Sequence, residues 1–189
     1  ELKTVYIGVD EKKFDPKKYN KKQLRKEYNI PDDRLVISYI CRIAVQKRPF
    51  LLIEIIKKFA AIRNDALFLI VGDGPLLDSF KKKINEYNLD NNVMFMGRFE
   101  ETQKIYSMSD ITINCSIKEG LALTSYESLA MNVPVITSDV GGQKELINSS
   151  VGEVVPCFQE EKDAEIFKYT DAEVDVYVEA LKKVSSKLA

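Results

Sequence analysis

The residues best placed to do chemistry are two carboxylates, Glu119 and Glu127, with seven residues between them. Gly120 follows the first, a run with helical character carries the second, and an apolar strand-like segment, Ile111 to Cys115, comes just before. A strand leading through a tight turn into a helix points backbone N–H groups and the positive end of the helix dipole at one spot. We expect an anion there, and the carboxylates favour an anion that carries hydroxyl groups, such as a nucleotide sugar.

The sequence around Glu127 makes it the more unusual of the two carboxylates. Ser125, Tyr126, Leu129 and Ala130 flank it on a segment that is expected to be mostly buried. Burying an unpaired carboxylate costs several kcal/mol or forces the group to protonate. We therefore expect Glu127 to have a partner, and a ribose diol would serve. The plainer interpretation is that both glutamates are surface residues, since glutamate is common on helices.

Two cations follow the strand expected at residues 34–40. Arg42 comes two residues after it, and Lys47 five residues later. Most Arg and Lys side chains are simply solvated, but this pair would lie on the same rim as Gly120. Charge-assisted hydrogen bonds to a diphosphate contribute about 1.5–3 kcal/mol each. The same groups would stabilise a departing diphosphate more than the bound ground state, so the chemistry would need no metal and no cofactor.

Composition narrows the class of protein. The chain has 189 residues, 45% of them apolar, which suits a single domain over residues 1–189. A net charge of −1 argues against a nucleic-acid binder. The chain has no histidine, which excludes Ser-His-Asp catalysis within it, and three scattered cysteines, Cys41, Cys115 and Cys157, which argue against a disulfide framework or zinc site. It does not begin with Met, and we expect it to start inside a longer protein.

Strand-like and helix-like segments alternate along the chain, which is typical of a doubly wound, Rossmann-like α/β domain with a parallel sheet of about six strands. The expected strands are residues 4–7, 34–40, 66–71, 93–96, 111–115, 133–136 and 152–155. The expected helices are residues 21–28, 50–63, 76–87, 102–108, 123–131, 143–147 and 174–188.

Ligands of such sheets bind beyond the carboxyl ends of the strands, near the point where strand order reverses. The segments at those ends are residues 42–47, 72–75, 97–99, 116–123 and 139–142. We expect these distant segments to meet on one rim. The glycine pair at residues 141–142 is expected to let the backbone approach a ligand closely.

Taken as a set, these segments resemble a known family. The chain is similar to the C-terminal, donor-binding half of retaining glycosyltransferases of the GT-B architecture, specifically glycosyltransferase family 4, the "glycosyl transferases group 1". The resemblance covers about residues 8–155. The residues that carry it are Gly8 to Asp10, Arg42 with Lys47, Val71 to Pro75, Val93 to Gly97, Glu119-Gly120 with Glu127, Ser128 to Ile136, and Asp139 to Glu145.

The resemblance implies roles for the cations and the first carboxylate. Arg42 and Lys47 would bind the donor diphosphate, and Glu119 would contact the sugar hydroxyls; these three are the expected catalytic residues. Backbone N–H groups from Gly120, Leu121, Ala122 and Leu123 would reach the sugar and the phosphate.

The resemblance also implies that Glu127 holds the ribose and that the loop at Gly97, Arg98 and Phe99 meets the base. The expected reaction moves a hexosyl group from a nucleotide-diphosphate sugar to a glycan or lipid-linked glycan with retention of configuration, without a metal. The partners would be that donor, that acceptor and an N-terminal acceptor domain that this chain lacks, without which the domain is expected to be inactive. The expected location is cytoplasmic, with any membrane association through the absent half.

Other classes fit less well. A dehydrogenase needs G-x-G-x-x-G after its first long strand, and residues 41–46 contain no glycine. The P-loop pattern G-x-x-x-x-G-K-[ST] is also absent. Two alternatives stay open: a nucleotide-sugar epimerase of similar fold, and a non-enzymatic nucleotide-sugar binding or docking module.

Overall fold

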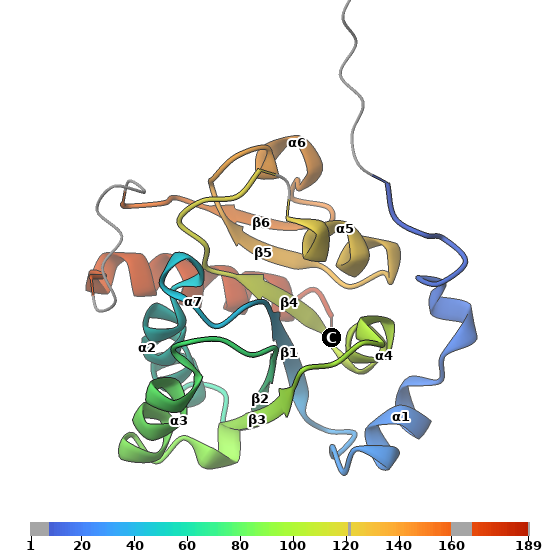
Figure 1. Ribbon diagram of the computed structural model, residues 1–189, viewed down its shortest axis with the longest axis horizontal. Coiled ribbons are helices and arrows are strands. Elements are labelled where there is room, and N and C mark those ends of the chain that lie inside the picture. The colour runs from blue at the N-terminus through green and yellow to red at the C-terminus, as the bar shows by residue number, and fades with distance from the viewer. Residues whose placement is uncertain (1–7, 121, 160–167, 189) are drawn as a thin grey trace, which may run out of the picture.

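A six-stranded parallel sheet forms the centre of the molecule. The computed structural model describes residues 8–120, 122–159 and 168–188. The strand order is β3-β2-β1-β4-β5-β6 (Figure 1). The strands are β1 (Leu35–Ile40), β2 (Ala66–Val71), β3 (Val93–Gly97), β4 (Ile111–Asn114), β5 (Val135–Ser138) and β6 (Gly152–Val155). The expected Rossmann-like class is confirmed, and the strand expected at residues 4–7 lies outside the described residues.

Helices connect the strands in alternation. They are α1 (Lys21–Glu27), α2 (Pro49–Ala60), α3 (Leu77–Glu86), α4 (Thr102–Met108), α5 (Leu123–Ala130), α6 (Gln143–Leu146) and α7 (Asp171–Ser185), with short 3₁₀ turns η1 (Pro16–Lys18), η2 (Val45–Lys47) and η3 (Asp90–Asn92). The strand order reverses between β1 and β4, so the loops after these two strands flank the switch point where ligands of such folds bind. No helix in the described ranges is long and apolar enough to cross a membrane.

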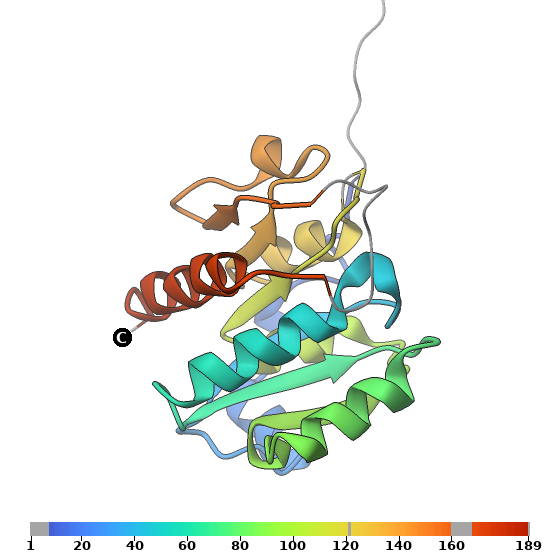
Figure 2. The ribbon, with the colours of Figure 1, turned by 90° about the vertical axis from the view of Figure 1, so that its left-hand side faces the viewer.

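Alternate residues of β1 point to opposite faces of the sheet, as the two-residue period of a strand requires. Ile37 and Tyr39 pack into a core with α2, α3 and α7. Val36 and Ile40 pack on the other side with residues of α1 and α4. Figure 2 shows α7 lying alongside α2 on one of these faces. The sheet is therefore covered on both sides, and its carboxyl edge is left for loops.

Three expected boundaries were wrong for identifiable reasons. The strand expected from residue 133 begins at Val135, because Asn132 has a left-handed φ of 58° and Pro134 has no N–H for a ladder. The second long helix ends at Ala60 rather than near residue 63, and Ile62 is 50% exposed. The last helix begins at Asp171, three residues before the first apolar position that suggested it.

Candidate functional site

The loops after β1 and β2 are held against each other. The N–H of Ile43 donates to the carbonyl of Asp73 at 2.9 Å, and the N–H of Leu76 donates to the carbonyl of Ile43 at 3.1 Å. A Cβ on Gly74 would lie 2.3 Å from the carbonyl oxygen of Ile43, and one on Gly72 would lie 1.9 Å from that of Cys41. These two glycines are required because the loops touch through their backbones.

Arg42 and Arg98 line an open cleft of about 800 Å³ beyond the ends of β1, β2 and β3. Arg42 is exposed, and its side chain makes no hydrogen bond or ion pair within the described part of the chain. Nε of Arg98 lies 3.3 Å from Oδ2 of Asp73, with the Arg98 side chain 85% exposed. Thr124, at the start of α5, lines the same cleft. The cleft therefore joins three strand ends and one helix start around exposed cationic side chains.

Gly97 shapes this edge through its backbone. It has a left-handed φ of 65°, and its carbonyl accepts a hydrogen bond of 2.8 Å from the N–H of Gly72. This contact links the loop after β3 to the loop after β2, and it places Arg98 beside Asp73. Gly97 is thus a structural residue of the cleft edge.

Lys47 lies in contact with Glu119, although the two are far apart in sequence. Nζ of Lys47 forms an ion pair with Oε1 of Glu119, and the hydroxyl of Ser116 donates to the same oxygen at 2.7 Å. The Lys47 and Glu119 side chains are 23% and 13% exposed. Gln46 reinforces the contact, since its side-chain amide donates to the carbonyl of Lys118 at 2.8 Å. The structure brings these two predicted residues together.

The glycine pair at residues 141–142 packs against the backbone of the loop at Gly120. The N–H of Gly142 donates to the carbonyl of Gly120 at 2.9 Å. Gly141 has a φ of 55°, and a Cβ there would lie 2.1 Å from the carbonyl oxygen of Glu119. Gly141 is therefore required by its close approach to the backbone that carries Glu119, and the expected approach of the glycine pair to a ligand stays a prediction.

Glu127 has partners within the protein. The Tyr106 hydroxyl donates to Oε2 of Glu127 at 2.9 Å, and the Thr102 hydroxyl lies 3.4 Å from the same atom. Partial burial raises the pKa of the Glu127 carboxyl, and the Tyr106 hydrogen bond counteracts that rise. The expectation that Glu127 has a partner is confirmed, with donors on α4 that the sequence did not indicate, and its contact with a ribose stays a prediction.

The Tyr106 hydroxyl also connects Glu127 to the cleft. It lies 3.2 Å from the carbonyl oxygen of Thr124, which is the α5 residue that lines the cleft. Thr124 and Glu127 are three residues apart on α5 and so share one face of that helix. Glu127 is therefore one helical turn from the cleft.

The first turn of α5 faces the loop at Gly120. Its N-cap is Ala122, which provides no side-chain hydrogen bond to the helix amides, so these N–H groups have no side-chain cap. Gly120 is exposed, and Leu123 is 45% exposed. Leu121 lies outside the described residues. The positive end of the helix dipole is thus directed toward the rim.

A buried polar chain beneath this turn was missed by the sequence analysis. The amide of Asn114 donates to the hydroxyl of Ser125 at 3.2 Å, and that hydroxyl donates to Oε1 of Gln143 at 3.0 Å. The exposed fraction is 5% for Asn114 and 0% for Ser125 and Gln143. The sequence signal for this chain was Asn114 at the end of the buried strand β4, because a buried polar side chain needs a hydrogen-bond partner.

Cys115 is buried, and Cys41 is half-buried. Burial raises the pKa of the Cys41 thiol to about 12, and it raises that of Cys115 as well, so both are inert thiols at neutral pH. All three cysteines are free. Across residues 8–120, 122–159 and 168–188, no three Cys, Asp or Glu side chains gather in a group that could hold a metal ion.

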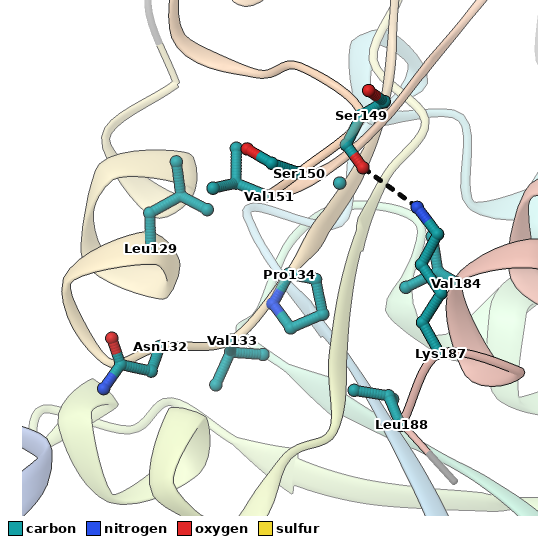
Figure 3. Close-up of a pocket in the computed structure, with 11 residues that line it drawn as sticks. Leu129, Asn132, Val133, Pro134, Ser149, Ser150, Val151, Val184, Lys187 and Leu188 are labelled. Carbon is teal, nitrogen blue, oxygen red and sulfur yellow. Dashed lines mark hydrogen bonds between the residues drawn. The ribbon is translucent and has the colours of Figure 1, made fainter.

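A second cavity, of about 340 Å³, lies at the opposite edge of the sheet. Figure 3 shows its walls, formed where β5 and β6 begin and where α5 and α7 end. Leu129, Val133, Val151 and Val184 give it an apolar lining, and Nζ of Lys187 donates to the carbonyl of Ser149 at 2.9 Å. None of the predicted site residues contributes to it.

Curated relatives share the sequence of this domain. The chain is 31% identical over 149 residues to N-acetyl-alpha-D-glucosaminyl L-malate synthase of Bacillus anthracis, covering 78% of this chain and 38% of that protein. It is 29% identical over 158 residues to alpha-D-kanosaminyltransferase of Streptomyces kanamyceticus, covering 82% of this chain and 41% of that protein. The chain thus spans less than half the length of these relatives.

Solved structures share the fold. A glycosyltransferase from Rickettsia africae ESF-5 superposes with a TM-score of 0.77 at 23% identity, over 96% of this chain and 46% of that one. Anabaena HepE, solved with UDP and glucose, gives a TM-score of 0.72 at 18% identity, over 97% of this chain and 49% of that one. The family model "Glycosyl transferases group 1" matches residues 20–170. The chain therefore belongs to the glycosyl transferases group 1 family.

Proposed function

We propose that this chain is the donor-binding domain of a retaining glycosyltransferase that takes a hexosyl group from a nucleotide-diphosphate sugar. The observation that carries the proposal is the contact of Lys47 with Glu119 between the loops after β1 and β4, at the switch point of the sheet. Arg42 lies on the same loop as Lys47 and lines a cleft to which Lys47 and Glu119 do not contribute. Arg42 and the start of α5 line one cleft, and Lys47 follows Arg42 on the loop after β1. A guanidinium, an ammonium and helix N–H groups are the donors that suit a diphosphate.

Lys47 is suited to hold a phosphate oxygen without releasing Glu119. An ammonium has three N–H donors, and the ion pair with Oε1 of Glu119 uses one of them. Arg42, exposed at the cleft, would add a planar fork that matches two phosphate oxygens. Charge grows on the diphosphate as the bond to the sugar breaks, so both cations stabilise the transition state more than the ground state. This chemistry uses no metal.

The two glutamates would each accept hydrogen bonds from a different part of the nucleotide sugar. Both described hydrogen bonds to Glu119 end on Oε1, so Oε2 is the oxygen that would accept from a sugar hydroxyl. The described hydrogen bonds to Glu127 end on its Oε2, so its Oε1 would accept from the ribose. The backbone of Gly120 to Leu123 would reach the sugar and the phosphate, and the loop at Arg98 would meet the base.

Solved structures of similar proteins support this assignment of donor. Anabaena HepE was solved with UDP and glucose, and a pneumococcal O-GlcNAc transferase was solved with UDP and GlcNAc. The chain spans less than half of its relatives, so we place the acceptor site, for a glycan or a lipid-linked glycan, in an N-terminal domain outside this sequence. Retention of the anomeric configuration is part of the proposal, and proton NMR of the product's anomeric signal tests it.

Calorimetric titration of the full-length protein with UDP and other nucleoside diphosphates tests the proposal. We expect binding of at least one of them, weakened about tenfold or more by Lys47→Ala because one charge-assisted contact is lost. Lys82→Ala is the matched control, since Lys82 is an exposed lysine of α3. Absence of binding at millimolar concentration, or equal weakening by both substitutions, would contradict it.

A further inference from the structure

Two ion pairs join α7 to α2 and to Arg48, the residue that precedes α2, and they differ in burial. Nη2 of Arg48 lies 2.6 Å from Oε2 of Glu173, and Nη1 contacts Oε1, with the side chains 4% and 1% exposed. The second pair, Lys58 with Asp175, is 48% and 50% exposed. Figure 2 shows the two helices running beside each other. A buried bidentate contact fixes direction as well as distance, which an exposed lysine pair does not.

Arg48 occupies a backbone position that few residues other than glycine adopt. Its φ is 57°, and it both ends η2 and caps the start of α2. A residue other than glycine keeps a left-handed backbone conformation only where the surrounding contacts hold it there. Here Glu173 holds the guanidinium, and the carbonyl of Lys168 accepts a further hydrogen bond from Nη2 at 3.2 Å. The burial and the charge of Arg48 thus set the backbone of the loop that precedes it.

That loop carries Lys47. The Tyr39 hydroxyl donates to the carbonyl of Lys47 at 2.7 Å, so the backbone next to Arg48 is held from the core as well. On the other side, the N–H of Ile117 donates to the carbonyl of Gln46 at 3.0 Å, which ties the loop to the segment that carries Glu119. The backbone that carries Lys47 is therefore held at residues 46, 47 and 48, while its side chain contacts Glu119.

We propose that Arg48 and Glu173 are positioning residues for Lys47. The inference rests on the proposed function, in which Lys47 binds the donor diphosphate. Glu173 of α7 holds Arg48, Arg48 holds the loop at residues 45–48, and the loop holds the ammonium of Lys47 at Glu119. The helix α7 is then a part of the diphosphate site, although none of its residues reaches the rim.

Chemical labelling of Lys47 tests this positioning without any nucleotide. Amine acetylation of the full-length protein, followed by mass spectrometry, compares Lys47 with the exposed Lys82. We expect Glu173→Gln to speed labelling of Lys47 by about fivefold, because the loop opens locally more often. Asp175→Asn removes the exposed pair between the same helices and is expected to leave the Lys47 rate unchanged.

Binding separates positioning from general stability. We expect Glu173→Gln to lower the affinity for UDP about tenfold, because the diphosphate contact depends on Lys47. The affinity for uridine, which has no diphosphate, should stay within about twofold of that of the parent protein. If Glu173→Gln fails to fold, Arg48→Met combined with Glu173→Met replaces the buried pair by apolar groups of similar volume and is expected to fold.

The outcomes are distinct. Unchanged Lys47 labelling in a folded Glu173→Gln or Met–Met variant overturns the inference, and equal weakening of UDP and uridine overturns it as well, because that is the mark of a purely structural pair. If the parent protein binds no nucleoside diphosphate, the proposed function fails, and the labelling result still decides whether the pair holds Lys47.

Discussion

The helices α2 and α5 both follow loops of the candidate site, yet they attach to the sheet by different physical means. Eight of the α2 residues are buried, all of them apolar, and they include Phe50, Ile53 and Phe59. The buried residues of α5 are Ser125 and Ser128. Apolar burial is strong and non-directional, whereas hydrogen bonds to buried partners fix orientation. The helix α2 therefore contributes stability, and α5 contributes placement.

The hydroxyl contacts of α5 show how that placement is achieved. The Ser128 hydroxyl bonds with Oγ1 of Thr112 at 2.8 Å, and Ser38 lies 3.0 Å from the same atom. The Ser125 hydroxyl joins Asn114 to Gln143. These bonds set the rotation of a helix that presents Thr124 to the cleft and Glu127 one turn beyond it. Apolar contacts alone would allow α5 to rotate about its axis.

The largest effect is expected from α2. Phe59→Ala removes a fully buried ring and should lower the free energy of unfolding by about 3–5 kcal/mol. The UDP affinity of the remaining folded protein should stay within about twofold, because the side chain lies in the core away from the rim. Urea unfolding and calorimetry measure the two quantities. A loss below about 1 kcal/mol would mean that α2 is not the stabilising helix.

A substitution in α5 is expected to cost less stability than Phe59→Ala but to lower the affinity for UDP more. Ser125→Ala leaves the Asn114 amide and the Gln143 oxygen without their shared partner, which should cost about 1–3 kcal/mol. UDP should bind several-fold more weakly because the first turn of α5 is no longer fixed. Ser186→Ala is the control, since that hydroxyl is exposed. An unchanged UDP affinity in Ser125→Ala would end the contrast between the helices.

The smallest effect is a pH dependence from Glu127. Burial raises the pKa of its carboxyl above the ordinary value, so the folded state holds this proton more tightly than the unfolded state. The stability it contributes is complete below the unfolded pKa and is lost as pH rises through the folded pKa. The free energy of unfolding of the parent protein should therefore fall relative to Glu127→Gln between about pH 4 and neutrality. Urea titrations across that range measure the difference, and a parallel pH profile would contradict it.

Much of the fold was predictable because it depends on apolar periodicity. The bounds of β2, β6 and α4 match the expected ranges, and β2 is a continuous apolar run that Gly72 ends. The meeting of Lys47 with Glu119 on one rim followed from parallel topology alone. The strand before residue 8 stays a prediction outside the described residues.

Other features were beyond sequence reasoning because their residues usually face water. Arg48 and Glu173 are types that are almost never buried unless paired, and they are 125 residues apart. Thr170 and Glu173 do have the spacing of a helix-capping pair, and the Thr170 side chain accepts from the N–H of Glu173, which would have placed the start of α7 correctly. Tyr106 as the donor to Glu127 had no sequence signal.

The central claim is that Arg42 and Lys47, on the loop after β1, bind a nucleoside diphosphate beside Glu119, and a crystal structure of the full-length protein with UDP tests it most directly. We expect diphosphate oxygens about 2.7–2.9 Å from Nζ of Lys47 and from the guanidinium of Arg42, with the ribose at Glu127. A nucleotide bound elsewhere, for example in the apolar cavity at Leu129, or with its phosphates turned away from Lys47, would contradict the account.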